Sequence, residues 1–477
     1  MYLRNQTGNG VEKSVSANSE DLNKLKEVLH SCVDDCINYL SNSNEISNSG
    51  FFQPPDTHPE IQNGGLELSA HYQQLKHLLF DNSQFLNAHP GFFAWSLGSG
   101  LGINLMANLI DATLNCPVQS TAQTMGKIEI EVINWVSKNL FDSTSFSGRF
   151  VSGSSHANQI ALNLARYSKS HNTKTMGLFD ADKFSVLGSA ATHFSVKKGM
   201  NILGLGEDAF LEIDMDFCGA HLFDKIETAI KKSQKTPLCL VATSGSTDTG
   251  AFDNLSELQE ICSHFNIWLH VDAAWGAWLK LVDDKSHLMA SIDAADSIAL
   301  DFHKWPGAPI GTAAIFYKDA ALAHDCFSST ANYISPISKN TALLQNIGIE
   351  TTRPSRALSV FSILNHYGLD FLKSRIASCC EHAHYFYSEL KNQKNIEFQQ
   401  SADLTAIVNF RFKFSSDDEI NNQITNAFIS KLWSEGSFMP SRILINSKVY
   451  VHFCFINTKT NSQHIDQLLN RIKSEVS

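Results

Sequence analysis

A lysine, Lys304, stands a few residues after an apolar run, within the sequence DFHKW (301–305). The preceding run, Ser297–Leu300, has the length and composition of a buried strand. Reactive residues of open α/β sheets gather outside the carboxyl ends of the strands, which is where Lys304 would lie. A lysine amine condenses with aldehydes, and burial or a neighbouring cation favours the attack by lowering its pKa. Taken alone, such a lysine is more often a surface side chain whose stem covers apolar neighbours.

A carboxylate, Asp272, ends a second apolar run, IWLHVD (267–272). An unpaired charge at the end of a buried strand is costly, so the residue needs a partner. One interpretation is a helix N-cap. The other is the partner of a protonated pyridine nitrogen, which pyridoxal-phosphate (PLP) enzymes need to keep the ring an electron sink. An Asp and a Lys at the ends of neighbouring strands could therefore serve one cofactor, the Asp at its ring nitrogen and the Lys at its aldehyde.

Two turns rich in glycine and hydroxyl groups follow further apolar runs. The first, VSGSSHAN (151–158), leads into a helical pattern, so its backbone N–H groups and hydroxyls could bind a phosphate. The second, TSGSTDTG (243–250), could donate hydroxyls to the same cofactor. A serine N-cap and an ordinary polar turn are the alternative interpretations.

The elements that must position these residues are predicted from hydrophobic periodicity. Short apolar runs alternate with helical patterns such as 156–169 and 255–265, which indicates an α/β fold with a mostly parallel sheet. The predicted strands are 149–151, 184–188, 238–242, 268–271, 297–300 and 312–317.

The pattern changes at both ends of the chain. After residue 368 a long helical stretch (369–393) precedes strand-like runs at 405–412 and 448–455 and a closing helix from Ser462, which predicts a smaller α+β domain. We therefore expect an N-terminal helical arm (1–95), a large cofactor-binding domain (96–368) and a small C-terminal domain (369–477).

Composition excludes several classes of protein. The 477 residues include 43% hydrophobic and 18% charged residues, typical of a globular chain, and the net charge of −11 argues against nucleic acid as a partner. The ten cysteines and the histidines lack zinc-site spacing, so no metal is expected. The first residues lack a signal-peptide pattern, and the most apolar stretch (97–110) is too short for a bilayer. We expect a cytoplasmic protein without membrane association.

Taken together, these segments resemble the group II PLP-dependent amino-acid decarboxylases, the family of glutamate, aromatic-amino-acid, cysteine-sulfinate and 2,4-diaminobutyrate decarboxylases. The resemblance runs from about His89 to the C-terminus. It is strongest at HVDAAW (270–275) and DFHKW, and good at TSGSTDTGAFDNL (243–255) and THFSVKK (192–198). It implies a fold-type-I PLP enzyme that releases CO2 from a small-molecule amino acid and acts as a homodimer.

The resemblance also implies roles for residues around the cofactor. Lys304 would be the Schiff-base lysine, and Asp272 would pair with the pyridinium nitrogen. His193 would stack on the cofactor ring and help orient the substrate carboxylate. His303 would line the site next to the lysine.

Further roles follow in the same way for hydroxyl-bearing residues. Ser154 and Ser155 would hold the phosphate, and Thr247 would contact the cofactor. Tyr333 matches the loop tyrosine that protonates the substrate carbon after CO2 leaves. Arg353 matches an arginine that recurs in the family, and the resemblance does not distinguish a role in the reaction from support of the fold.

Several positions depart from the family pattern. Trp95, Ser96 and Gly98 stand where aromatic-amino-acid decarboxylases carry a more aromatic substrate wall. Asp301 stands where many members have an Asn that reaches the phosphate, so either Asp301 is turned away or hydroxyls and backbone hold the phosphate. His156 replaces a common Glu. His452 stands where many members have an arginine that clamps the substrate carboxylate, which argues against glutamate as the substrate.

Three alternatives to decarboxylation stay open at this point. A carbon–carbon lyase and an oxygen-dependent aldehyde-forming enzyme would use the same cofactor. A member of the family without catalytic activity would keep only the fold.

Overall fold

The computed structural model describes residues 19–41, 61, 63–81, 86–118, 120, 123–179, 183–214, 220–329, 343–399 and 404–476. Contacts along the chain separate two compact units, Met1–Phe85 and Leu86–Ser477.

The first unit contains two helices, α1 (Ser19–Ser41) and α2 (Leu68–Lys76), in the regions where the sequence predicts helices. Asp35 of α1 joins them, because it accepts hydrogen bonds from the Tyr72 hydroxyl at 2.5 Å and from Lys76 Nζ at 2.8 Å. These bonds hold the pKa of Asp35 below its usual value.

The second unit is built on a sheet that has, within the described residues, seven strands in the order β1-β7-β6-β5-β4-β2-β3. Strands β3, β2, β4, β5 and β6 are parallel, and β7 is antiparallel to both of its neighbours, so β1 runs in the same direction as β6. All six predicted strands are confirmed, and β3 is additional. Their bounds are β1 (Ser147–Val151), β2 (Phe184–Gly188), β3 (Phe210–Glu212), β4 (Thr236–Thr243), β5 (Trp268–Asp272), β6 (Ser297–Asp301) and β7 (Ala313–Tyr317).

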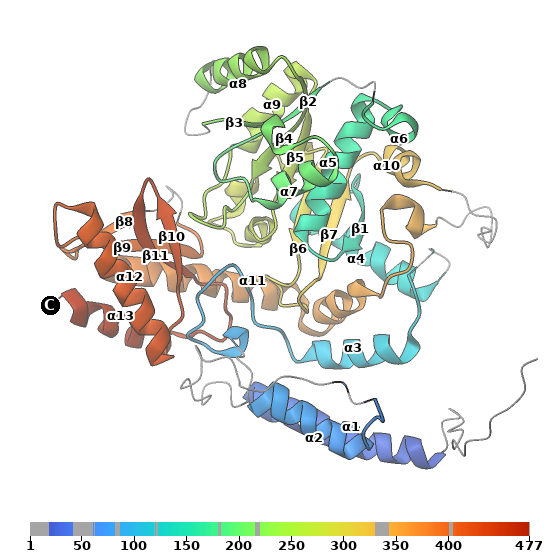
Figure 1. The fold of residues 1–477 in the computed structure, drawn as a ribbon, viewed down its shortest axis with the longest axis vertical. Helices are drawn as coiled ribbons and strands as arrows, with labels where there is room; N and C mark the ends of the chain where they lie inside the picture. Colours follow the sequence, from blue (N-terminus) through green and yellow to red (C-terminus); the bar gives the residue numbers. More distant parts are fainter. Residues whose placement is uncertain are drawn as a thin grey trace, which may run out of the picture. The chain divides into compact units, whose positions relative to one another are not determined.

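Helices cover both faces of this sheet (Figure 1). Successive side chains of a strand point to opposite faces. In β6, Ile298 and Leu300 accordingly join one core cluster while Ala299 joins another, which includes residues of α5. The helices around the sheet are α3 (Ile103–Leu114), α4 (Thr124–Leu140), α5 (Ser154–Lys169), α6 (Thr173–Met176), α7 (Ser195–Ile202), α8 (Ala220–Ser233), α9 (Leu255–Phe265) and α10 (Ala320–Phe327). The structure confirms the α/β class with a mostly parallel sheet.

A second, antiparallel sheet lies in the C-terminal region, with the strand order β10-β11-β9-β8. The long helix α11 (Arg356–Leu390) leads to it and departs from helical geometry at Gly368, where φ is 77°. The sequence places the boundary of the small domain at this residue, although the three-domain division itself stays a prediction. The remaining elements are β8 (Ile396–Gln399), β9 (Ile407–Phe412), α12 (Asp418–Glu435), β10 (Ser441–Ile445), β11 (Lys448–Cys454) and α13 (Ser462–Val476).

Two kinds of feature are absent from the described residues. No helix there combines the length and the apolar character that crossing a bilayer requires. Within the same ranges, no cluster of His, Cys, Asp and Glu side chains could hold a metal ion.

Candidate active site

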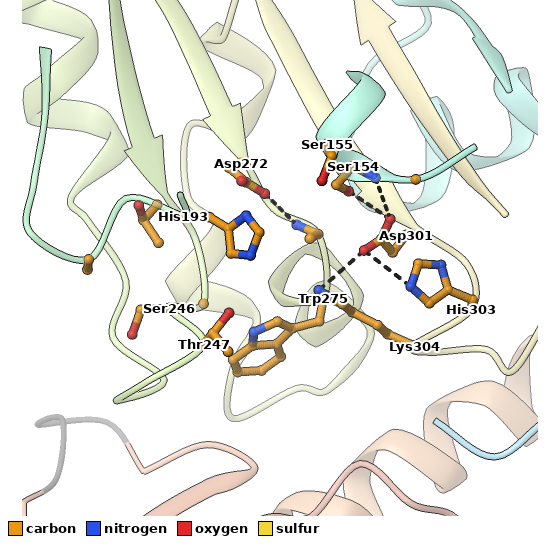
Figure 2. A pocket seen from close by; sticks show the side chains of 15 residues that line it. Ser154, Ser155, His193, Ser246, Thr247, Asp272, Trp275, Asp301, His303 and Lys304 are labelled. Carbon is orange, nitrogen blue, oxygen red and sulfur yellow. Dashed lines mark hydrogen bonds and ion pairs between the residues drawn. The ribbon is translucent and has the colours of Figure 1, made fainter. Parts of the chain in front are cut away.

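The carboxyl ends of five strands, β1, β2, β4, β5 and β6, lead into segments that line one cavity of about 230 Å³. This is the edge of the sheet at which ligands bind in open α/β folds. Figure 2 shows the side chains around the cavity. The cavity is lined by every predicted cofactor-site residue: Ser154, Ser155, His193, Thr247, Asp272, His303 and Lys304. Tyr333 lies outside the described residues.

Asp272 is the last residue of β5, and it lies between Thr243 of β4 and Ala299 of β6. Only 8% of the residue is exposed. Its carboxylate accepts hydrogen bonds from Asn158 Nδ2 at 2.8 Å and from the backbone N–H of Ala274 at 3.3 Å. Both donors are neutral amides, so they orient the carboxylate without neutralising it. A protonated pyridine nitrogen would supply the missing opposite charge.

Lys304 approaches the cavity from the strand next to that of Asp272. Its Nζ lies 3.2 Å from Asp301 Oδ2, and His303 Nε2 lies 3.7 Å from the same oxygen. The other oxygen of Asp301 accepts hydrogen bonds from the Ser154 hydroxyl at 2.8 Å and the Ser154 backbone N–H at 3.0 Å. Figure 2 shows Asp301 between these groups. Asp301 therefore positions both the lysine and the first residue of α5.

This arrangement corrects one expectation from the sequence. Asp301 is not turned away, since it lines the cavity with 3% of its surface exposed. The hydroxyl of Ser154 donates to that carboxylate, so it is engaged in this structure and not free for a phosphate. A phosphate would therefore be held by Ser155, by other hydroxyls and by backbone N–H groups of the turns, which is the second expectation from the sequence.

The donor set on this side of the cavity fits a phosphate. The N-terminus of α5 follows Gly153, whose φ of 148° disfavours any side chain and whose missing Cβ leaves open space. Ser155 and Thr247 line the same cavity with their hydroxyls, whereas the hydroxyl of Ser246 is engaged by Thr249 and by the backbone N–H of Ala251. The hydroxyl oxygen of Thr243 is buried there and has no partner within the described residues. PLP carries an anionic phosphate and a ring nitrogen that can be protonated. The N-terminus of α5 suits the phosphate and Asp272 suits the ring nitrogen, so the residues fit this cofactor.

His193 lies in the segment after β2, where it lines the cavity. Its Nδ1 is 2.7 Å from the hydroxyl oxygen of Ser195, the first residue of α7. Burial lowers the pKa of His193 below the usual histidine value, although the nearby charge of Asp272 opposes the shift. The imidazole is therefore neutral at neutral pH.

The sequence interpretation missed three residues that hold Asp272 and His193 in place. Asn158 and His270 are fully buried, and Ser195 is 2% exposed. Two of them carried a usable signal. Asn158 follows Ser154 by four residues, one helical turn, and His270 precedes Asp272 by two residues, on the same side of the strand.

Two departures from the family pattern lie outside the cavity lining. His452 is buried in β11, where its Nδ1 lies 2.8 Å from Asn409 Oδ1 of β9. Asn409 in turn donates to the backbone oxygen of Asp248, in the turn that carries Thr247. His156 lies 3.4 Å from the Ser152 hydroxyl through its Nδ1, and burial lowers its pKa.

Arg353 belongs to the scaffold beneath β1. Its guanidinium makes two hydrogen bonds of 2.6 Å with the Glu129 carboxylate, and both side chains are 1% exposed. Glu129 also accepts the backbone N–H of Phe150 at 3.1 Å.

Arg353→Met should destabilise the fold, because it leaves the Glu129 charge buried without a partner. The expected loss is about 3–5 kcal/mol of the free energy of unfolding. The double variant Glu129→Gln/Arg353→Met should regain much of it, since neither member of the buried pair is then charged. Urea unfolding of the three proteins measures both values. A single variant with wild-type stability but lost activity would instead give Arg353 a role in the reaction.

Comparisons with known proteins identify the family of this chain. Residues 82–413 match the family model described as "Pyridoxal-dependent decarboxylase conserved domain". The aromatic-L-amino-acid decarboxylase of Bacillus atrophaeus is 30% identical over 399 residues, 81% of this chain and 81% of that protein.

Solved structures share the fold at lower sequence identity. Oryza sativa TDC, solved with PLP and tryptamine, superposes with a TM-score of 0.86 at 17% identity, over 97% of this chain and 98% of that one. Mouse CSAD superposes with a TM-score of 0.84 at 22% identity, over 95% and 99% of the two chains. The chain thus has the fold-type-I architecture and belongs to the pyridoxal-dependent decarboxylases, carboxy-lyases whose cofactor is pyridoxal 5'-phosphate.

Proposed function

We propose that Lys304 binds PLP covalently through Nζ and that the enzyme removes CO2 from an L-amino acid. The observation that supports this assignment is the placement of Asp272 and Lys304 at the ends of two adjacent parallel strands, on one cavity. When bound, the cofactor supplies the electron sink for the pair of electrons that stays on the substrate carbon when CO2 leaves.

The residues of the chain have separate tasks in this proposal. Asp272 keeps the ring nitrogen protonated by placing a carboxylate beside it. The N-terminus of α5 and the hydroxyl of Ser155 bind the phosphate, and Thr247 contacts the cofactor. Asp301 holds Lys304 Nζ at the cavity, and His193 would lie against the ring of the bound cofactor.

The proton that returns to the substrate carbon needs a donor. We propose Tyr333 for this task on the strength of the family resemblance alone, because the residue lies outside the described ranges. His193 is the described side chain in the cavity that could act in its place.

We propose aromatic L-amino acids as the substrate class. The similarity to the decarboxylase of Bacillus atrophaeus supports this class. The environment of His452 argues against an acidic substrate, because burial lowers its pKa to about 4 and keeps it neutral at neutral pH. A neutral, buried histidine bound to Asn409 cannot clamp a second carboxylate.

A panel of amino acids tests the reaction and the substrate class together. The PLP-loaded protein should release CO2 from at least one aromatic L-amino acid and should not prefer L-glutamate. Trapped CO2 and the amine product, both quantified for each amino acid, give the measurement. A clear preference for glutamate would mean that His452 does not bear on substrate choice, and aldehyde in place of amine would favour the oxygen-dependent alternative.

We also propose that the enzyme is a cytoplasmic homodimer. An apolar stripe on α3 supports self-association, because five large side chains of this helix are 39–58% exposed: Leu105, Met106, Leu109, Ile110 and Leu114. Exposed apolar patches of this kind mark interaction surfaces.

A further inference from the structure

A continuous hydrogen-bond network joins Asp272 to His193. It begins at Asn158 of α5, whose Nδ2 lies 2.8 Å from Asp272 Oδ2 and 3.0 Å from Ser195 Oγ. Ser195 Oγ lies 2.7 Å from His193 Nδ1. On its other side, Asn158 Oδ1 lies 3.0 Å from His270 Nε2.

The direction of each bond follows from the ionised Asp272. A carboxylate only accepts hydrogen bonds, so Asn158 must present its NH2 group to it. The second hydrogen of that NH2 group then points to Ser195 Oγ. Ser195 Oγ accepts this hydrogen and can still donate its own hydrogen to His193 Nδ1. The Ser195 backbone N–H, 3.3 Å away, points to the same Nδ1.

The far side of the network is consistent with this direction. Asn158 Oδ1 accepts, so His270 must carry its proton on Nε2, and His270 Nδ1 must accept. Its neighbour at 2.9 Å is Ser297 Oγ. Trp268 Nε1 can only donate, and it donates to Ser297 Oγ at 2.8 Å. The Ser297 hydroxyl can still donate its own hydrogen to His270 Nδ1.

One competing arrangement is excluded by charge. His270 Nδ1 also lies 3.2 Å from the backbone oxygen of Ser297, a contact that would suit a proton on Nδ1. His270 Nε2 would then accept, and the Asn158 amide would have to turn over. Its oxygen would face the Asp272 carboxylate at the 2.8 Å contact, which is repulsive for an ionised acid.

We propose that Asn158 is a positioning residue that, through Ser195, keeps His193 in the tautomer protonated on Nε2. Asn158 thereby couples the charge of Asp272 to the proton position on the histidine. The Nδ1 atom is engaged by two donors of Ser195, so Nε2–H is the group left to act in the cavity. The lowered pKa of His193 agrees, because a neutral ring has one proton to place.

The consequence for the reaction rests on the proposed function. A neutral imidazole with Nε2–H donates a hydrogen bond to an acceptor such as a substrate carboxylate, and at that atom it cannot remove a proton. His193 would therefore orient the leaving carboxylate in the resting enzyme and would not serve as its general base.

Nuclear magnetic resonance of the PLP-loaded protein with 15N-labelled histidine tests the tautomer at pH 8. The His193 signal is assigned by its loss in His193→Gln. Correlations between each ring nitrogen and the ring hydrogens distinguish a proton on Nε2 from one on Nδ1. We expect Nε2–H in the wild type, and a wild-type ring protonated on Nδ1 would overturn the proposal.

Two variants test the route through Asn158 and Ser195. Asn158→Leu keeps a similar volume but removes the NH2 group that Ser195 Oγ accepts, so Ser195 Oγ becomes free to accept from His193 and a population protonated on Nδ1 should appear. Ser195→Ala removes the hydroxyl donor and leaves only the backbone N–H on Nδ1, so the preference for Nε2–H should weaken, with a fall in kcat of about tenfold. His193 held as Nε2–H in both variants would overturn the proposal.

Ser185→Ala is the matched control, because Ser185 is fully buried in β2 and its hydroxyl has no partner within the described residues. It should leave the tautomer unchanged, and a change there equal to that of Ser195→Ala would count against the network. The outcome is separable from that of the proposed function. A wild-type Nε2–H signal in a protein that releases CO2 from no amino acid would support the network and contradict only the decarboxylation.

Discussion

Lys304→Ala should abolish decarboxylation, with a fall in kcat/KM of about 10⁴-fold or more, or about 5.5 kcal/mol of transition-state stabilisation. Alanine has no amine that could bind the cofactor covalently. The change also leaves Asp301 without its cationic neighbour at 3.2 Å. The variant should therefore lose the visible absorbance of the covalently bound cofactor as well. CO2 release and the absorption spectrum after PLP loading measure the two effects.

Lys280→Ala is a suitable control for this variant. Lys280 is partly buried, with 22% of its side chain exposed, and it forms an ion pair with Asp142 at 2.7 Å, outside the cavity lining. Both variants should unfold at nearly the wild-type urea concentration, while only Lys304→Ala loses activity. Unchanged turnover and spectrum in Lys304→Ala would remove this lysine from the reaction.

Asp272→Asn should lower kcat/KM by about 10³-fold, or about 4 kcal/mol, because a neutral amide no longer favours a protonated ring nitrogen. An unprotonated ring is a poorer electron sink. The shape of the side chain is retained, and the bond from Asn158 at 2.8 Å can still be made to the amide oxygen. The measurement is kcat/KM with the best substrate of the panel, together with the affinity for PLP.

Asp296→Asn provides the comparison for Asp272→Asn. Asp296 accepts the backbone N–H of Leu269 at 2.8 Å, near the start of the strand that ends at Asp272. Burial raises the pKa of Asp296, so the charged form of this carboxyl is disfavoured by its surroundings. Asp296 lies outside the cavity lining. Its amide variant should keep wild-type kcat/KM. Near-normal rates in Asp272→Asn would contradict the pyridinium role.

The sequence predicts the central sheet well because its strands are buried on both faces and read as uninterrupted apolar runs. The strand 184–188 has the predicted bounds, and all five of its residues are buried. Strands β3, β8 and β10 were missed for the opposite reason. They are three to five residues long and partly exposed, so their composition resembles that of a turn.

The candidate site divides in a similar way. Lys304 and Asp272 could be predicted because an ionisable residue at the end of an apolar strand needs a reason to be there. The position of Asn158 one helical turn after Ser154 indicates that it faces the site, but its bond to Asp272 spans 114 residues and could not be read from a local pattern. Likewise, the bond between Asp301 and Ser154 depends on how β1 and β6 are placed around β7, which is a property of the sheet order.

The position of the covalent cofactor link tests the central claim most directly. The PLP-loaded protein is reduced with borohydride, digested with a protease and analysed by mass spectrometry, so that the lysine carrying the cofactor is identified. The account predicts the modification on the peptide that contains DFHKW, at Lys304, and its absence from that peptide when PLP is omitted. A modification located on another lysine, or none at all in a fully loaded protein, would contradict the account.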